Sequence, residues 1–114
     1  MSANPKCLVW NVRGLNSPAK RTTVLQVVSR ICPALVCFQE TKLQTCAVIV
    51  EQCLGRNFDF YYLAASGSRG GILLAWQPNL LSLSHPHLSE HSIAARVRSA
   101  EGDWWITGVY GPHQ

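Results

Sequence analysis

The chain has 114 residues, enough for one small domain, and 47% of them are hydrophobic, an ordinary fraction for a globular protein. Ten lysines and arginines against six acidic residues give a formal net charge of +4, which favours a polyanionic partner only mildly. No apolar run approaches the roughly 20 residues needed to cross a bilayer, and the N-terminus lacks the apolar core of a signal peptide.

The cysteines do not follow the pattern of a disulfide framework or a zinc ribbon. Their number is odd, no Cys-x-x-Cys occurs, and each lies in an apolar run where a free thiol packs as a small hydrophobe. They are Cys7, Cys32, Cys37, Cys46 and Cys53. We therefore expect reduced thiols and a nuclear or cytoplasmic location.

The first half of the chain begins with a strand and a helix. Residues 6–12 form an apolar run typical of a buried strand. A helix is expected over residues 20–31, since Ser17 can cap it and Pro18 suits its first turn. Pro33 ends that helix.

A second strand and helix follow. Residues 34–38 are a short, continuous apolar run, which is typical of a strand buried on both faces. Residues 45–54 have helical spacing, and Gly55 is a suitable C-cap. Because a helical crossover joins parallel strands that usually lie side by side, we expect residues 6–12 and 34–38 to be neighbours.

The second half reads as consecutive antiparallel strands. These are expected at residues 58–64, 72–76, 79–84, 92–98 and 104–110. Trp104 and Trp105 would point to opposite faces of the last strand, so we expect one in the core and the other at the surface. The pattern predicts an α/β fold with one mixed sheet and two helices.

Two polar side chains directly follow the apolar strands of the first half. Asn11 comes after the first strand and Glu40 after the second. The carboxyl ends of parallel strands form the ligand edge of an α/β sheet, so we expect the two side by side. A lone carboxylate beside an amide suits a hard cation such as magnesium, which takes oxygen ligands and keeps several waters. Alternatively, Asn11 forms a turn and Glu40 caps the next one.

Basic residues follow the same strand ends. Arg13, Lys20, Arg21 and Lys42 can line a track of nucleic-acid phosphates, although Lys20 and Arg21 also fit a solvated helix start. Arg69 opens an Arg-Gly-Gly turn. It can reach a phosphate or be the exposed cation of a hairpin, and the glycines after it permit close backbone approach.

Aromatic and imidazole side chains add two further candidates. Tyr110 ends the last expected strand near the same rim, where its hydroxyl can donate to a phosphate or its ring can close the core. His85, His87 and His91 have metal-ligand spacing, but Pro86 interrupts the strand, and loop histidines are the simpler interpretation. We find no nucleophile triad, P-loop or dinucleotide fingerprint.

Four phrases, in this order, resemble one protein family. WNVRGLNS, VCFQETKL, GSRGGILLAW and TGVYGP are similar to the endonuclease domain of plant LINE-type (non-LTR) retrotransposons, in the endonuclease/exonuclease/phosphatase superfamily. The resemblance runs from about Lys6 to Pro112. It implies the N-terminal half of a four-layered, DNase I-like α/β sandwich and magnesium-dependent hydrolysis of a DNA phosphodiester.

The resemblance also implies roles for three residues. Asn11 would lie in the metal and phosphate pocket, Glu40 would hold magnesium, and Tyr110 would hydrogen-bond the phosphate. The family's Asp-x-Asn element, which activates water, and its Ser-Asp-His element, which contacts the phosphate, do not occur in these 114 residues. Ser89-Glu90-His91 matches the second in type but precedes Tyr110 in the chain, so we interpret it as coincidence.

Residues 1–114 are therefore expected to be a single truncated domain without its second half, with a weak or incomplete magnesium site. Half a sandwich would leave the inner face of its sheet uncovered, so we expect poor stability or association with a second copy or another partner. Three functions remain open: a fragment of a DNA endonuclease that is inactive alone, a non-catalytic nucleic-acid-binding module, and a protein-interaction module.

Overall fold

The computed structural model describes residues 6–45, 47–67 and 69–109. Within them lie two helices and seven strands. In chain order these are β1 (Cys7–Asn11), α1 (Pro18–Ile31), β2 (Leu35–Gln39), α2 (Ala47–Leu54), β3 (Asp59–Leu63), β4 (Ile72–Trp76), β5 (Leu81–Leu88), β6 (Ser92–Ser99) and β7 (Gly102–Val109).

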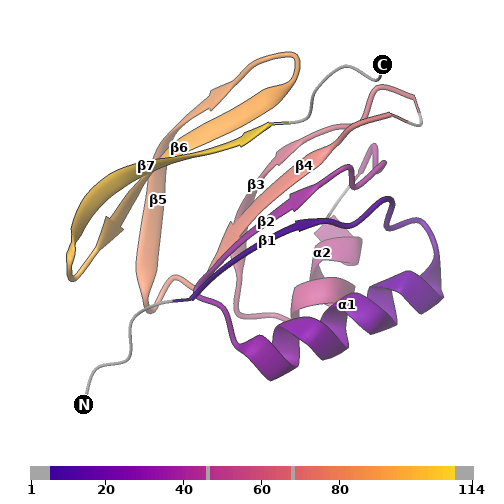
Figure 1. Cartoon of the computed structure of the whole chain (residues 1–114), viewed down its shortest axis with the longest axis horizontal. Helices are drawn as coiled ribbons and strands as arrows, with labels where there is room; N and C mark the ends of the chain where they lie inside the picture. Colours follow the sequence, from indigo (N-terminus) through magenta and orange to yellow (C-terminus); the bar gives the residue numbers. More distant parts are fainter. Residues whose placement is uncertain (1–5, 46, 68, 110–114) are drawn as a thin grey trace.

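The strands form two sheets. The first has the order β1-β2-β4-β3, with β1 parallel to β2 and the other pairs antiparallel, and the second is the antiparallel sheet β5-β6-β7. Both helices lie on one face of the first sheet, and the second sheet lies on its other face (Figure 1). The predicted α/β fold is confirmed, and so is the neighbouring pair of the first two strands.

The expectation of a single sheet was wrong. The chain leaves β4 through a tight connection in which Gln77 donates from its backbone N–H to the carbonyl of Ala34, at 2.9 Å, and the carbonyl of Gln77 accepts from Leu80 and Leu81. The next strand is thereby directed across the inner face of the first sheet. That face is thus partly covered, and not open as expected.

Two hydrophobic cores hold the layers together. The first, between the helices and the first sheet, contains Val24, Val28, Val36, Val50, Phe38, Cys53, Leu54 and Leu73. The second, between the two sheets, contains Leu35, Cys37, Ile72, Leu74, Trp76, Leu83, Ile93, Ala95 and Val97. As predicted, β2 is buried on both faces, and the all-apolar strand β4 is its antiparallel neighbour.

Local signals set the helix ends as expected. The side chain of Ser17 accepts from the backbone N–H of Lys20, Pro18 is the first residue of α1, and Cys32 closes that helix in the left-handed conformation before Pro33. Gly55, at φ 83°, follows α2. Val48 is 69% exposed, because Val50, Cys53 and Leu54 form the buried stripe of this short helix.

Two expectations about the second sheet were also wrong. The strand β5 continues through Pro86, which a register shift between Ser84 and His87 accommodates on an edge strand. Trp104 and Trp105 are both exposed, at 43% and 54%. Trp104 faces inward, opposite the buried Val97, but it lies on the last strand of the sheet, beyond the cover of β1–β4.

The cysteines fall into two groups. Cys37 and Cys53 are buried as expected, and burial raises the pKa of each thiol to about 11, opposed at Cys53 by the charge of Arg21. Cys7 and Cys32 are exposed, contrary to expectation, because the first lies on the edge strand β1 and the second at the end of α1. Cys46 lies outside the described residues.

Among the described residues, neither helix is long and apolar enough to cross a membrane.

Candidate metal and phosphate site

Three strand ends meet at one rim of the molecule. Asn11, the last residue of β1, is the register partner of Gln39, the last residue of β2, and Glu40 follows directly. The side chain of Gln39 donates from Nε2 to the carbonyl oxygen of Val109, at 2.9 Å, which ties the end of β7 to the same place. Asn11 and Glu40 thus occupy adjacent strand ends. Tyr110 follows Val109 but lies outside the described residues.

The two loops that leave β1 and β2 stay paired beyond the strands. Val12 donates from its backbone N–H to the carbonyl of Gln39 at 3.0 Å, and Gly14 donates to that of Glu40 at 2.7 Å. Arg13, Glu40 and Lys42 have φ values of 54°, 54° and 58°, in the left-handed backbone region that residues other than glycine seldom adopt. Such backbone strain persists where surrounding contacts impose it, and it is concentrated at functional sites.

The amide of Asn11 has a structural partner. Its Oδ1 accepts from the backbone N–H of Arg13, at 3.2 Å, which forms an Asx turn immediately after β1. The turn-forming interpretation therefore holds. It is compatible with a ligand role, because an amide oxygen has two lone pairs and this hydrogen bond uses one of them.

The Arg-Gly-Gly turn supports the loop that carries Glu40. The backbone N–H groups of Thr41 and Lys42 donate to the carbonyls of Gly71 and Gly70, at 3.1 and 2.8 Å. A Cβ at Gly71, where φ is 88°, would lie 2.3 Å from Oγ1 of the buried Thr41. The predicted close backbone approach is confirmed.

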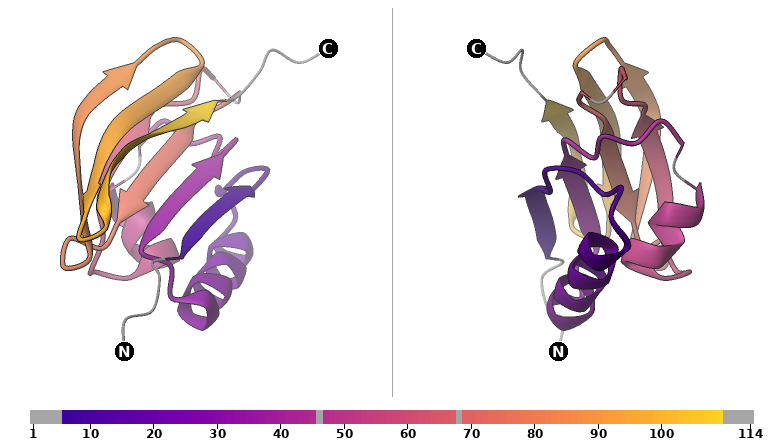
Figure 2. Two further views of the ribbon diagram at one scale, coloured as in Figure 1. Left: turned by 60° about the vertical axis from the view of Figure 1, so that its left-hand side comes forward. Right: turned by 90° about the vertical axis from the view of Figure 1, so that its right-hand side faces the viewer.

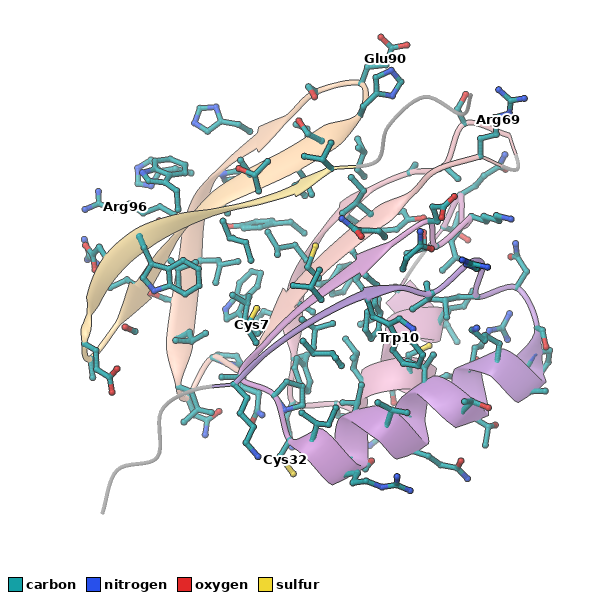
Figure 3. The ribbon with its side chains drawn as sticks, viewed as in Figure 1. Cys7, Trp10, Cys32, Arg69, Glu90 and Arg96 are labelled. Carbon is teal, nitrogen blue, oxygen red and sulfur yellow. The ribbon has the colours of Figure 1, made fainter. Side chains whose placement is uncertain are left out.

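Arg69 lies on a tight hairpin turn. It exchanges both backbone hydrogen bonds with Ser66, at 2.8 and 3.0 Å, and its side chain is exposed. Figure 3 shows it at the end of the molecule where β1, β2 and β7 finish. The interpretation of Arg69 as the exposed cation of a hairpin is confirmed. The contact between Arg69 and a phosphate stays a prediction.

The remaining predicted cations differ in what they contact. Arg13 and Lys42 are exposed on the paired loops of the rim. Lys20 lies on the helix side of β1, where its Nζ is 5.9 Å from the centroid of the Trp10 ring. Arg21 donates to the carbonyls of Leu15 and Asn16, at 2.8 and 3.0 Å, and to Oε1 of Gln52, at 3.2 Å. Arg21 therefore holds the loop after β1 against both helices.

A polar hollow of about 370 Å³ opens beside Lys42. Its lining includes Asn16, Gln44, Thr45 and Gly67 of the hairpin turn. The sequence interpretation missed this feature, as well as the tie from Gln39 to β7. Gln39 and Thr41 flank Glu40 in the phrase Phe-Gln-Glu-Thr-Lys. That cluster of polar residues after an apolar strand was the sequence signal from which both features could have been predicted.

The donor set at the rim fits magnesium in part. Glu40 offers a carboxylate and Asn11 an amide oxygen, and magnesium is commonly held by one or two carboxylates while waters and phosphate oxygens fill its other positions. No group of three His, Cys, Asp or Glu side chains that could hold a metal occurs within residues 6–45, 47–67 and 69–109. The histidine triplet thus forms no such group. His87 instead packs near Trp105, with ring centroids 5.7 Å apart and the two rings tilted by 44°.

No family model and no curated protein matches the sequence. Solved structures do match the fold. An AP endonuclease from Leishmania major has a TM-score of 0.67 at 16% identity, over 93% of this chain and 40% of its own. The APE2 catalytic domain from Xenopus laevis has 0.69 at 12%, over 94% and 45%. The 3′ phosphatase NExo from Neisseria, bound to a product DNA hairpin, has 0.69 at 17%, over 93% and 41%.

These similarities show that this chain shares the fold of those three structures. The chain spans less than half the length of each of these three structures. The predicted half of a DNase I-like α/β sandwich is thereby confirmed.

Proposed function

We propose that this chain is the N-terminal half of a magnesium-dependent DNA endonuclease domain of retrotransposon type, and that by itself it binds DNA without cleaving it. The observation that carries the proposal is the convergence of β1, β2 and β7, which brings Asn11 and Glu40 to one rim. The solved structures with this fold include an AP endonuclease and a phosphatase bound to DNA, which is consistent with a phosphodiester substrate.

The residues at the rim would have different roles in binding. Glu40 and Asn11 would hold magnesium, which when bound would offset negative charge on the scissile phosphate. Arg13, Lys42 and Arg69 would contact neighbouring phosphates, since all three are exposed. Arg13 and Lys42 lie on the paired loops after β1 and β2, and Arg69 lies at the end of the molecule where these strands finish (Figure 3). Tyr110 follows Val109, whose carbonyl oxygen accepts from Gln39. The hydroxyl of Tyr110 would donate a hydrogen bond to a phosphate oxygen.

Two of the predicted cations are less suited to contact DNA directly. Arg21 already makes three hydrogen bonds within the protein, and Lys20 faces Trp10 on the helix side. We assign both to the margin of the binding surface. Their main contribution would be long-range attraction of the polyanion.

Cleavage would require the water-activating and histidine elements, which these 114 residues lack. A non-catalytic nucleic-acid-binding module is the second candidate function. It is favoured by the left-handed loops, which present Arg13 and Lys42 independently of any metal.

Two assays test these candidates. Plasmid nicking with magnesium should show no activity that depends on Glu40, and cleavage lost in Glu40→Ala would refute the proposed inactivity. DNA affinity should fall on Arg13→Ala or Lys42→Ala, with a salt dependence shallower by about one counterion each. Arg30→Ala is the matched control, because Arg30 is exposed in the last turn of α1, away from the rim.

An equal loss in all three arginine and lysine variants would indicate that net charge, and not the rim, binds DNA. No measurable affinity for DNA would refute both nucleic-acid candidates and favour the protein-interaction module.

A further inference from the structure

The second sheet has an outer face, which points away from the first sheet. Figure 2 shows that no other element of the described residues lies over it. Ile93, Ala95 and Val97 of β6 point into the core between the sheets, so the residues that alternate with them, and their register partners, point outward. The residues of the outer face are Ser82, Ser84, His87, Ala94, Arg96, Arg98, Asp103, Trp105 and Thr107.

The outer face has one large aromatic side chain. Trp105 is 54% exposed, although the ring of His87 lies beside it, with centroids 5.7 Å apart and planes tilted by 44°. His87 is on β5 and Trp105 is on β7, so the two rings approach each other across the middle strand β6. The exposed indole thus offers a flat apolar surface on which a planar group can stack.

Two arginines lie next to this ring. Arg96 is directly opposite Trp105 in the register, and Arg98 is opposite Asp103. Nη2 of Arg96 and Nε of Arg98 both form ion pairs with Oδ2 of Asp103, at 2.9 and 3.5 Å, while the arginine side chains remain 40% and 68% exposed. One carboxylate therefore orients two guanidinium groups, each with five N–H donors, and the outer face keeps a net positive charge.

This combination of groups matches the chemistry of a nucleic-acid strand with unpaired bases. Such strands are bound by aromatic side chains on which bases stack, and by cationic side chains that hold the neighbouring phosphates. An antiparallel sheet with exposed aromatic residues is one of the common platforms for this mode of binding. A duplex is a poorer fit, because its bases already stack on one another. The net positive charge favours a polyanion over a neutral planar ligand.

We propose that the outer face binds single-stranded DNA, with a base stacked on Trp105 and the adjacent phosphates held by Arg96 and Arg98. This surface is separate from the rim, since Figure 3 shows Arg96 at the opposite end of the molecule from Arg69. The choice of DNA over RNA rests on the proposed function, because a duplex held at the rim and an unpaired strand held here can be parts of one DNA molecule.

Neighbouring tryptophans provide a matched pair of variants. Trp104 and Trp105 are both exposed, at 43% and 54%, but Trp104 is on the inner face, opposite the buried Val97. In anisotropy titrations of a labelled thymidylate oligomer, Trp105→Ala should weaken binding at least about fivefold, the lower end of the loss expected for one stacked base. Trp104→Ala should leave the affinity unchanged. Equal losses in the two variants would overturn the proposal.

An abasic oligomer of the same length separates stacking from charge, because it has the same phosphates and no bases. The wild type should prefer the thymidylate oligomer, and this preference should disappear in Trp105→Ala. Arg98→Ala should make the salt dependence shallower by about 0.7 counterion. Equal wild-type affinity for both oligomers, or a loss in Arg98→Ala no larger than in the control Arg30→Ala, would overturn the proposal. Tighter binding of a uridylate oligomer would overturn DNA as the occupant.

Photocrosslinking of the wild type provides a readout that does not depend on the folding of any variant. An oligomer containing 5-bromodeoxyuridine is irradiated with the protein, and the crosslinked peptide is identified by mass spectrometry. The crosslinks should fall on Trp105 or His87. Crosslinks on Trp104, or crosslinks confined to the rim, would overturn the proposal.

Duplex DNA tests the rim separately. If Arg13→Ala weakens duplex binding while the thymidylate oligomer binds without dependence on Trp105, the proposed function stands and the outer-face site is refuted. If the oligomer binds with dependence on Trp105 and the duplex does not bind at all, the outer-face site stands and the rim is refuted as the duplex-binding surface.

Discussion

Replacing Gly71 by alanine tests whether the Arg-Gly-Gly turn is required to support the Glu40 loop. The added Cβ would lie 2.3 Å from Oγ1 of Thr41 and 3.2 Å from the backbone nitrogen of Lys42. Thr41 is fully buried, so its side chain cannot yield without displacing the loop. The backbone at φ 88° adds the ordinary cost of placing a Cβ in the left-handed region.

The expected magnitude follows from these two effects. A left-handed residue with a Cβ costs about 1–2 kcal/mol, and overpacking a buried site costs about 1–3 kcal/mol more. Gly71→Ala should therefore lower the free energy of unfolding by about 2–5 kcal/mol. Gly55→Ala is the matched control, because its φ is 83° but no atom lies within 4 Å of its added Cβ. It should lose only about 1–2 kcal/mol.

Urea unfolding followed by tryptophan fluorescence measures both variants under the same conditions. The difference between them isolates the clash with Thr41 from the backbone strain. Equal losses would refute the reasoning, since they would mean that the two chain segments are not packed together at Gly71. The rim would then lack the support from the β3–β4 turn described above.

The remaining stability and reactivity predictions concern Arg21 and the thiols. Arg21→Ala should lower the free energy of unfolding, measured in urea, by about 1–3 kcal/mol, because two loop carbonyls lose their donor. A smaller loss than that measured for the exposed Arg13→Ala would contradict the role of Arg21 in holding the loop. Cys32 should be alkylated well before Cys37 and Cys53, as peptide mass spectrometry can show, since it is exposed and they are buried. Equal rates would contradict the two cores. Burial raises the pKa of the thiols of Cys37 and Cys53 from 9.0 to about 11. The unfolded chain therefore releases these protons first, so stability should be unaffected well below pH 9 and should fall as the pH rises from about 9 to about 11. A smaller fall is expected in Cys53→Ala, and an unchanged slope would contradict the assignment.

Local signals were sufficient to predict the elements that position the rim. The Ser-Pro start of α1, the twice-buried strand β2 and the glycines after Arg69 each depend on neighbouring residues, and the structure agrees with them. The placement of Asn11 beside Glu40 followed from a general property of parallel strands joined by a helix.

Features that depend on distant contacts could not be predicted in this way. The division into two sheets results from the connection after β4, which is held by Ala34, more than 40 residues earlier in the chain. The exposure of Trp104 depends on which strands of the other sheet lie opposite it. The alternation of side chains along a single strand does not identify those strands. The continuation of β5 through Pro86 required knowledge that β5 is an edge strand.

Manganese titration of isotopically labelled protein tests whether Glu40 holds a metal ion at the rim. Manganese accepts the same oxygen ligands as magnesium and broadens the amide signals of nearby residues. We predict selective broadening of residues 11–14 and 39–42. It should be abolished by Glu40→Ala and retained in Glu90→Ala, whose carboxylate is exposed in the turn between β5 and β6 (Figure 3). Broadening centred on the histidines of β5, or broadening at the rim that survives Glu40→Ala, would contradict the assignment of this rim as the metal and phosphate site.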